Sequence, residues 1–107
     1  ALMRQLRPAE LAAYLQAGHA PVLLDVREPW EWDVCRLPDA ILVPMRELPS
    51  RLQELNKAAE TVVIGPHGFR SYHAARDRES AGFGDVINLS GGVAAWADEV
   101  DPAMPRY

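Results

Sequence analysis

Residues 61–71 read Thr61-Val62-Val63-Ile64-Gly65-Pro66-His67-Gly68-Phe69-Arg70-Ser71. The first four form a short apolar run that ends at a glycine and a proline, a pattern typical of a buried strand. From residue 71 to residue 81 the sequence favours a helix, which Gly82 would end. A strand that passes directly into a helix is the repeating unit of a parallel α/β sheet, and such sheets bind ligands at the carboxyl ends of their strands. The loop 65–71 falls at such an end.

This loop is a candidate anion-binding site, made of Gly65, Pro66, His67, Gly68, Phe69, Arg70 and Ser71. Backbone N–H groups at the start of a helix have no partner within the helix, and the positive end of the helix dipole lies beside them. Arg70 would add a charge and paired donors, or it would close the loop on a nearby carboxylate. The loop carries no thiol, because its first position is Gly65 and the only cysteine of the chain is Cys35.

The rest of the chain repeats the alternation of strand and helix. Strands are predicted at 4–6, 21–26, 41–43 and 85–89, and helices at 10–16, from residue 28, along Leu48, Leu52 and Leu55, and around Val93 and Trp96. Strand 21–26 is apolar throughout, as expected for a strand covered on both faces. The alternation predicts a single α/β domain over 1–107, with a parallel sheet and helices on both faces.

Composition narrows the class of protein. The chain has 107 residues, 49% hydrophobic and 24% charged, which is ordinary for a globular domain. Its net charge of −4 and scattered basic residues argue against nucleic-acid binding. No apolar run is long enough to span a membrane, and the N-terminus lacks the pattern of a signal peptide. Because the chain has one cysteine, it cannot form an intrachain disulfide, and we expect a cytoplasmic protein. The three histidines are not spaced as metal ligands usually are, so we expect no metal site and no cofactor.

Five fragments together resemble a single rhodanese-homology domain. They are Leu-Leu-Asp-Val-Arg-Glu at 23–28, Cys-Arg-Leu-Pro-Asp-Ala at 35–40, Gly-Phe-Arg-Ser at 68–71, Gly-Phe at 82–83, and Asn-Leu-Ser-Gly-Gly-Val-Ala-Ala-Trp at 88–96. The resemblance covers nearly the whole chain. It implies a rhodanese-like, five-stranded parallel sheet and, in active members, thiosulfate-type sulfur transfer through a cysteine persulfide held in a loop of the form Cys-x-x-Gly-x-Arg-Ser.

The same alignment implies a departure from the family at the reacting position. Gly65 falls where the sulfur-carrying cysteine stands, and glycine has no side chain to accept sulfur. Pro66 removes one backbone N–H from the ring of donors. Cys35 falls on a position where the family usually has glycine. The loop has the length found in sulfurtransferases, whereas phosphatases of this fold use a longer one, so a phosphatase or arsenate reductase is disfavoured.

Other polar residues have two interpretations each. Asp25 and Arg27 could be site residues, but we expect them to support the loop through hydrogen bonds. His67 could act as a base or an anion partner, although with no nucleophile to activate we expect a partly exposed loop histidine. Cys35 could carry sulfur in place of the missing thiol, yet a buried structural cysteine is the simpler interpretation. The three tryptophans are expected to pack in or beside the core, although any of them could instead lie at the rim of a partner surface: Trp30, Trp32 and Trp96.

The sequence therefore predicts a rhodanese-like domain of sulfurtransferase ancestry that has no catalytic residue at its loop. Such a pseudoenzyme would bind a small sulfur-containing or other anion, or a protein partner. The alternative is a thiosulfate sulfurtransferase whose loop cysteine is altered or misassigned in this chain.

Overall fold

The computed structural model describes residues 4–67 and 84–107. Its elements are β1 (Arg4–Leu6), α1 (Pro8–Gln16), β2 (Val22–Asp25), α2 (Pro29–Val34), β3 (Ile41–Leu42), the 3₁₀ turn η1 (Met45–Glu47), α3 (Leu48–Arg51), the 3₁₀ turn η2 (Leu52–Glu54), β4 (Thr61–Ile64), β5 (Val86–Leu89) and α5 (Gly92–Glu99). The helix predicted for 71–81, with Gly82 as its end, lies outside the described residues.

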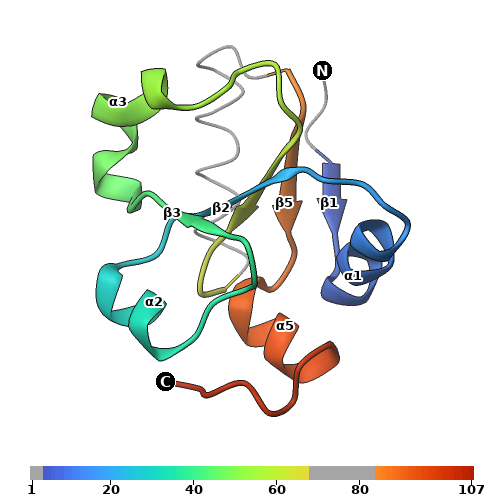
Figure 1. The fold of residues 1–107 in the computed structure, drawn as a ribbon. Helices are drawn as coiled ribbons and strands as arrows, with labels where there is room; N and C mark the ends of the chain where they lie inside the picture. Colours follow the sequence, from blue (N-terminus) through green and yellow to red (C-terminus); the bar gives the residue numbers. More distant parts are fainter. Residues whose placement is uncertain (1–3, 68–83) are drawn as a thin grey trace.

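The strands form one sheet in the order β1-β5-β4-β2-β3, and every neighbouring pair is parallel. Figure 1 shows this sheet at the centre of the molecule, with α1 beside β1 and with α2 and α5 toward the C-terminus. The predicted α/β fold with a parallel sheet is therefore confirmed. Register places Asp25 of β2 beside Ile64 of β4, so the carboxyl ends of these central strands meet at one edge.

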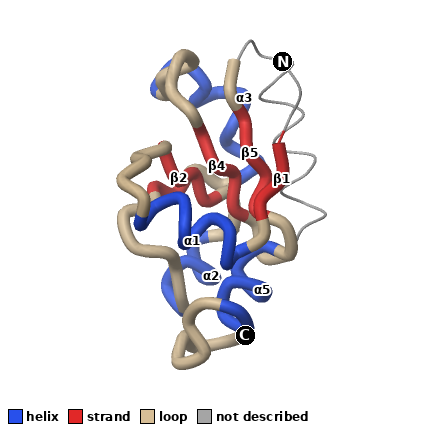
Figure 2. Tube along the Cα trace, turned by 90° about the vertical axis from the view of Figure 1, so that its right-hand side faces the viewer, coloured by secondary structure: helices blue, strands red, loops and turns tan. Residues whose placement is uncertain are grey.

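Both faces of the sheet are covered, as the apolar strand 21–26 predicts. Leu23 belongs to a core cluster shared with α1 and α5, whereas Leu24 belongs to a second cluster on the opposite face, with Leu48 of α3. Both side chains are buried, at 6% and 0% exposure. The edge-on view of Figure 2 shows α1, α2 and α5 grouped together, with α3 apart from them.

One predicted helix is interrupted. Leu48, Leu52 and Leu55 do pack on the same core cluster, but the segment is split into η1, α3 and η2. Pro49 lies in the first turn of α3, so it accounts only for the boundary with η1: proline has no N–H to donate to the preceding turn, and its ring clashes with that turn's carbonyl. The break between α3 and η2 falls at Arg51, whose φ of −116° and ψ of 5° leave the helical range.

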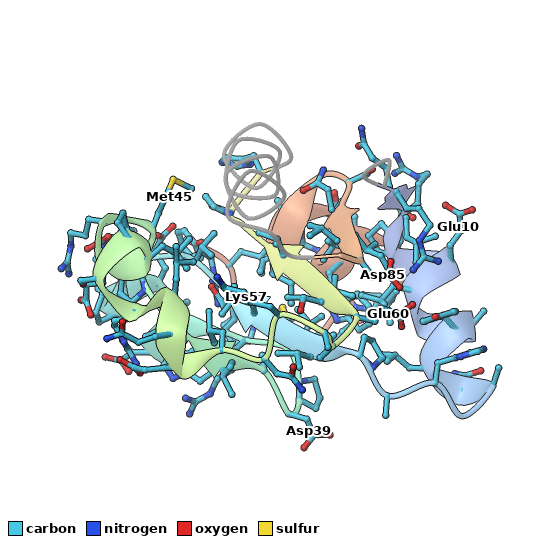
Figure 3. The ribbon with its side chains drawn as sticks, turned by 90° about the horizontal axis from the view of Figure 1, so that it is seen from above. Glu10, Asp39, Met45, Lys57, Glu60 and Asp85 are labelled. Atoms are coloured by element: carbon cyan, nitrogen blue, oxygen red, sulfur yellow. The ribbon has the colours of Figure 1, made fainter. Side chains whose placement is uncertain are left out.

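Polar side chains gather at the amino ends of the strands. Arg4 donates hydrogen bonds to Glu60 and Asp85, at 2.7 and 2.9 Å, and Glu60 also accepts one from Tyr14 at 2.6 Å. Glu60 and Asp85 lie close together in the view of Figure 3. These groups are partly exposed, so their ion pairs stabilise the fold only weakly. Within 4–67 and 84–107, no helix has the length and apolar character needed to cross a membrane.

Candidate functional site

The loop that follows β4 starts at the carboxyl edge of the sheet. Gly65 and Pro66 are buried and His67 is exposed. The N–H of Val93 donates to the carbonyl oxygen of Gly65 at 2.8 Å, and the N–H of Ala94 donates to that of Pro66 at 3.2 Å. Two of the N–H groups at the start of α5 are thus used to hold the beginning of the loop.

Two glycines make this close approach possible. Gly91 and Gly92 both have left-handed backbone conformations, with φ of +78° and +61°. A Cβ atom on Gly92 would overlap the carbonyl oxygen of Gly65 and would lie 2.8 Å from the backbone nitrogen of His67. Glycine is therefore required at position 92 for two reasons: the backbone has a left-handed conformation, and there is no room for a side chain.

A buried ion pair lies next to the loop, where β2 ends. The Asp25 and Arg27 side chains are both fully buried, and Nη2 of Arg27 lies 2.8 Å from Oδ2 of Asp25. Nε of Arg27 also donates to both carboxylate oxygens at 3.0 Å. Burial disfavours the charged guanidinium, but the hydrogen bonds with Asp25 and Tyr107 outweigh it and raise the pKa of Arg27 above its usual value.

Arg27 also ties together segments that are far apart in the sequence. Its guanidinium donates to the carbonyl oxygens of Glu31 and Cys35, at 3.3 and 2.5 Å, and so holds the end of α2. It donates to the hydroxyl of Tyr107 at 3.2 Å. Tyr107 in turn donates to Oε2 of Glu31 at 2.8 Å. Oε1 of Glu31 accepts from the N–H of Glu28, so one buried carboxylate caps α2 and also binds the far end of the chain.

Tyr107 ends a segment that we name the C-terminal strap, residues 104–107. The strap begins at Met104, which is 7% exposed and belongs to the core cluster. Between these anchors, Arg106 donates to the carbonyl oxygen of Ala97 at 3.2 Å and to Asp98 at 2.5 Å. Burial and the bond to Glu31 raise the pKa of Tyr107 to about 12, although Arg27 acts in the opposite direction.

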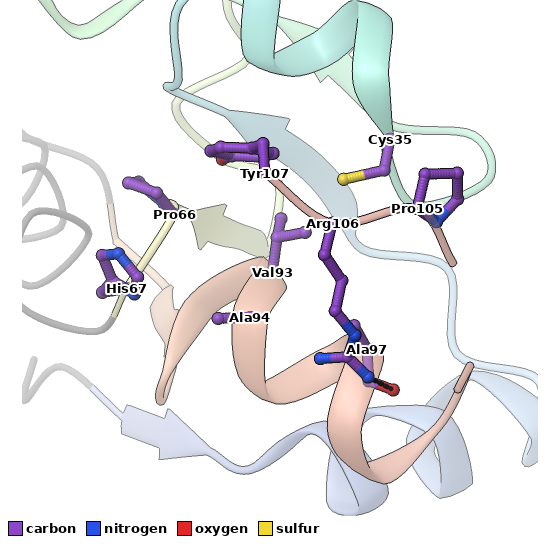
Figure 4. Close-up of a pocket in the computed structure, with 9 residues that line it drawn as sticks. All are labelled: Cys35, Pro66, His67, Val93, Ala94, Ala97, Pro105, Arg106 and Tyr107. Carbon is purple, nitrogen blue, oxygen red and sulfur yellow. Dashed lines mark hydrogen bonds between the residues drawn. The ribbon is translucent and has the colours of Figure 1, made fainter. Parts of the chain in front are cut away.

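A cavity of about 180 Å³ lies between the strap, α5 and the start of the loop (Figure 4). It is lined by Cys35, Pro66, His67, Val93, Ala94, Ala97, Pro105, Arg106 and Tyr107. Cys35 is 8% exposed, and its Sγ lies 3.8 Å from Nη1 of Arg27. The only cysteine of the chain therefore lines the same cavity as Pro66 and His67.

The structure describes only part of the predicted site. Gly65, Pro66 and His67 are described, whereas Gly68, Phe69, Arg70 and Ser71 lie outside the described residues. Asp25 and Arg27 are at the same edge of the sheet as Gly65. Among the described residues, the side-chain hydrogen bonds of Arg27 go to Asp25, to α2 and to Tyr107.

Two participants were missed at the level of sequence. Glu31 and Tyr107 complete the cluster around Arg27. A signal for Glu31 existed, because Glu28 and Glu31 have the spacing of a helix cap. Nothing local to Tyr107 indicates its partner. The part of the chain that the structure describes contains no group of three or more potential metal ligands.

The prediction for the tryptophans is wrong for one of them. Trp96 is buried at 6% and Trp32 is half-buried, but Trp30 is 59% exposed. Trp30 lies in the first turn of α2, and its ring meets that of Tyr107 edge-on at 5.1 Å. It therefore packs on the strap and not in the core.

Comparison with known proteins finds relatives that match most of this chain. The profile of the rhodanese-like domain family matches residues 7–99. The probable adenylyltransferase/sulfurtransferase MoeZ of Mycobacterium tuberculosis is 36% identical over 102 residues, which cover 94% of this chain and 26% of MoeZ. A sulfurtransferase of Allochromatium vinosum is 40% identical over 76 residues, which cover 71% of either chain. The chain thus spans about a quarter of MoeZ and most of the shorter relative.

A solved structure shows the same architecture. The crystal structure of a rhodanese-like domain protein from Staphylococcus aureus superposes with a TM-score of 0.83 and 31% identity. The match covers 92% of this chain and 95% of that one. The resemblance stated from the sequence fragments therefore holds over the whole sheet.

Proposed function

The chain belongs to the rhodanese-like domain family, which is related to sulfurtransferases, and we propose that this domain binds a small anion at loop 65–71 without transferring sulfur. The observation that carries the proposal is Gly65. It follows β4 directly, at the sheet edge where a ligand would bind, and it offers no side chain to form a persulfide.

Pro66 weakens anion binding at the loop without abolishing it, and Arg70 supplies the charge. Pro66 contributes no N–H to a bound anion, and its carbonyl is committed to α5. We assign the positive charge of the site to Arg70, which the sequence places four residues farther along the loop. An anion held by backbone donors and one guanidinium needs no nucleophile, so binding survives the loss of the thiol.

Cys35 does not replace the missing thiol in this proposal. Its side chain is buried against Arg27 and the cavity floor, so a sulfur donor reaches it only through the cavity. The assay combines the protein with thiosulfate and cyanide and measures thiocyanate. We expect none above background. Turnover that disappears in Cys35→Ser would instead make Cys35 the carrier and overturn the proposal.

Anion binding is measured separately, by titrating thiosulfate while following the backbone amide signals of Gly65 and His67. We expect saturable shifts that Arg70→Gln weakens. The matched control is Arg4→Gln, which removes a partly exposed arginine that pairs with Glu60 and Asp85 at the opposite, amino ends of the strands. Equal weakening by both variants would show that the anion binds only through overall charge.

The alternative, a thiosulfate sulfurtransferase whose loop cysteine is altered, is favoured by the names of the relatives. It predicts that Gly65→Cys restores chemistry: the new thiolate would attack the outer sulfur of thiosulfate, form a persulfide and release sulfite, and cyanide would then take the sulfur as thiocyanate. If Pro66 also blocks the loop, only Gly65→Cys combined with Pro66→Ala gains this activity. Intact mass spectrometry detects the added sulfur atom.

A further inference from the structure

The cavity beside the loop has an apolar floor and a mixed rim. Its floor consists of four buried residues, Cys35, Pro66, Val93 and Ala97, which come from α2, the loop and α5. The other lining residues are exposed and surround the opening (Figure 4). A group that enters from solvent therefore meets methyl groups, a proline ring and a thiol at the bottom.

Two polar side chains of the rim, those of Arg106 and Tyr107, are already engaged elsewhere. Arg106 bonds to Asp98 and to the carbonyl of Ala97, and the hydroxyl of Tyr107 bonds to Arg27 and Glu31. No lining residue is a carboxylate. A charged ligand would lose its water without gaining a dedicated partner among these side chains, and that loss disfavours it.

The volume of the cavity limits the size and the flexibility of a ligand. The cavity volume of about 180 Å³ is close to that of the roughly 150 Å³ engineered cavity that holds benzene in another protein. A flexible chain would have to order several bonds to fill such a space, whereas a ring or a branched aliphatic group fills it with little loss of entropy.

We propose that this cavity binds an uncharged, compact apolar group of about the size of a benzene ring, carried by a small organic molecule. The site adjoins the anion site of loop 65–71, with which it shares Pro66 and His67, and its ligand goes beyond the function proposed above. Its floor would contribute apolar burial, and the ring of Tyr107, exposed at the rim, would cover one side of the ligand.

The test is an NMR titration of the full chain with benzene, with benzenesulfonate and benzylamine as charged probes of similar ring size. We expect saturable shifts of the amide signals of Val93, Ala94 and Ala97 with benzene. Each charged probe should bind at least about tenfold more weakly, because its charge must leave water. As an independent readout, benzene should slow the alkylation of Cys35 by iodoacetamide.

A bulky residue at the rim should close the site. Ala94 is exposed in the first turn of α5, so Ala94→Phe is expected to fold and to weaken benzene binding by about tenfold or more. Ala9→Phe places the same exchange at an exposed position in the first turn of α1 and should leave binding unchanged.

Three outcomes would overturn the proposal: shifts that do not saturate, shifts spread evenly over the protein, or equal effects of the two phenylalanine variants. Stronger binding of benzenesulfonate than of benzene would replace the apolar ligand by an organic anion. The anion proposal is tested by the weaker thiosulfate binding expected of Arg70→Gln, and the cavity proposal by the weaker benzene binding expected of Ala94→Phe, so failure of one is separable from failure of the other.

Discussion

The N–H of Val93 donates a 2.8 Å hydrogen bond to the carbonyl oxygen of Gly65, so the start of α5 and the start of the loop are held as one unit. This contact joins the turn after β5 to the turn after β4, at neighbouring strand ends. Changes in the glycines before α5 should therefore act directly on the candidate anion site.

Gly92→Ala is expected to destabilise the protein by about 2–4 kcal/mol, since it adds a clash with the loop to the cost of a left-handed alanine. Gly18→Ala is the matched control, because Gly18 has a φ of +98° but no atom within 4 Å of the position that a Cβ would occupy. It should cost only about 1–2 kcal/mol, from the conformation alone. Urea unfolding measures both. Equal losses would show that the loop yields to the added methyl group without cost.

Removing the Arg27 guanidinium should be far more damaging than removing an exposed one. Arg27→Met leaves Asp25 buried without its cation, at a cost of about 3–5 kcal/mol. Arg46→Met breaks ion pairs of a side chain that is 58% exposed, and it should cost less than about 1 kcal/mol. The comparison uses urea unfolding at neutral pH. A similar small loss in both variants would contradict a structural role for the buried pair.

Tyr107→Phe should open the wall of the cavity. The variant loses the hydroxyl that bonds to Arg27 and Glu31 but keeps the ring, so the strap is held less tightly. We expect Cys35 to react severalfold faster with iodoacetamide, roughly the factor of 5 to 10 that corresponds to one hydrogen bond. Tyr14→Phe removes a tyrosine hydroxyl bonded to Glu60, away from the cavity, and serves as the control. Unchanged alkylation in Tyr107→Phe would mean that the strap does not limit access.

The same phenol gives a pH dependence with a defined sign. The pKa of Tyr107 is raised from 10.0 to about 12, first by burial and then by its bond to Glu31. A raised pKa means that the fold favours the protonated phenol. Its contribution to stability is fully present below pH 10 and is lost as the pH rises through about 12. The stability difference between the wild type and Tyr107→Phe should shrink over this interval in urea unfolding at successive pH values. A constant difference would show that the phenol titrates normally.

Local sequence patterns were sufficient to predict the parallel sheet. The apolar run of β4 was predicted with its observed limits, and β2 was correctly expected to be covered on both faces. The segment around Leu48 was predicted as one helix because its leucines repeat at helical spacing, and they do share a core cluster. The backbone of Arg51 leaves the helical range between α3 and η2, and the apolar pattern contains no signal for that break.

Contacts between residues far apart in the chain could not be predicted from the sequence. Tyr107 and Glu31 are separated by 76 positions, and no local pattern joins them. The position of Trp30 could not be predicted for the same reason, because its ring packs on Tyr107, which is far away in the sequence. Cys35 was expected to be buried, and it is, but its place on the floor of the cavity depends on the strap and α5 together.

The bond between Arg27 and Tyr107 also sets an order of events during synthesis. The two residues are 80 positions apart. At roughly 5–20 residues per second, a ribosome needs about 4–16 s to pass from one to the other. Throughout that interval neither the guanidinium of Arg27 nor the carboxylate of Glu31 has the hydroxyl of Tyr107 to bind. Tyr107 is thus synthesised last and completes a cluster whose other members, Arg27 and Glu31, are synthesised early. The growing chain must keep those two side chains accessible until Tyr107 is added.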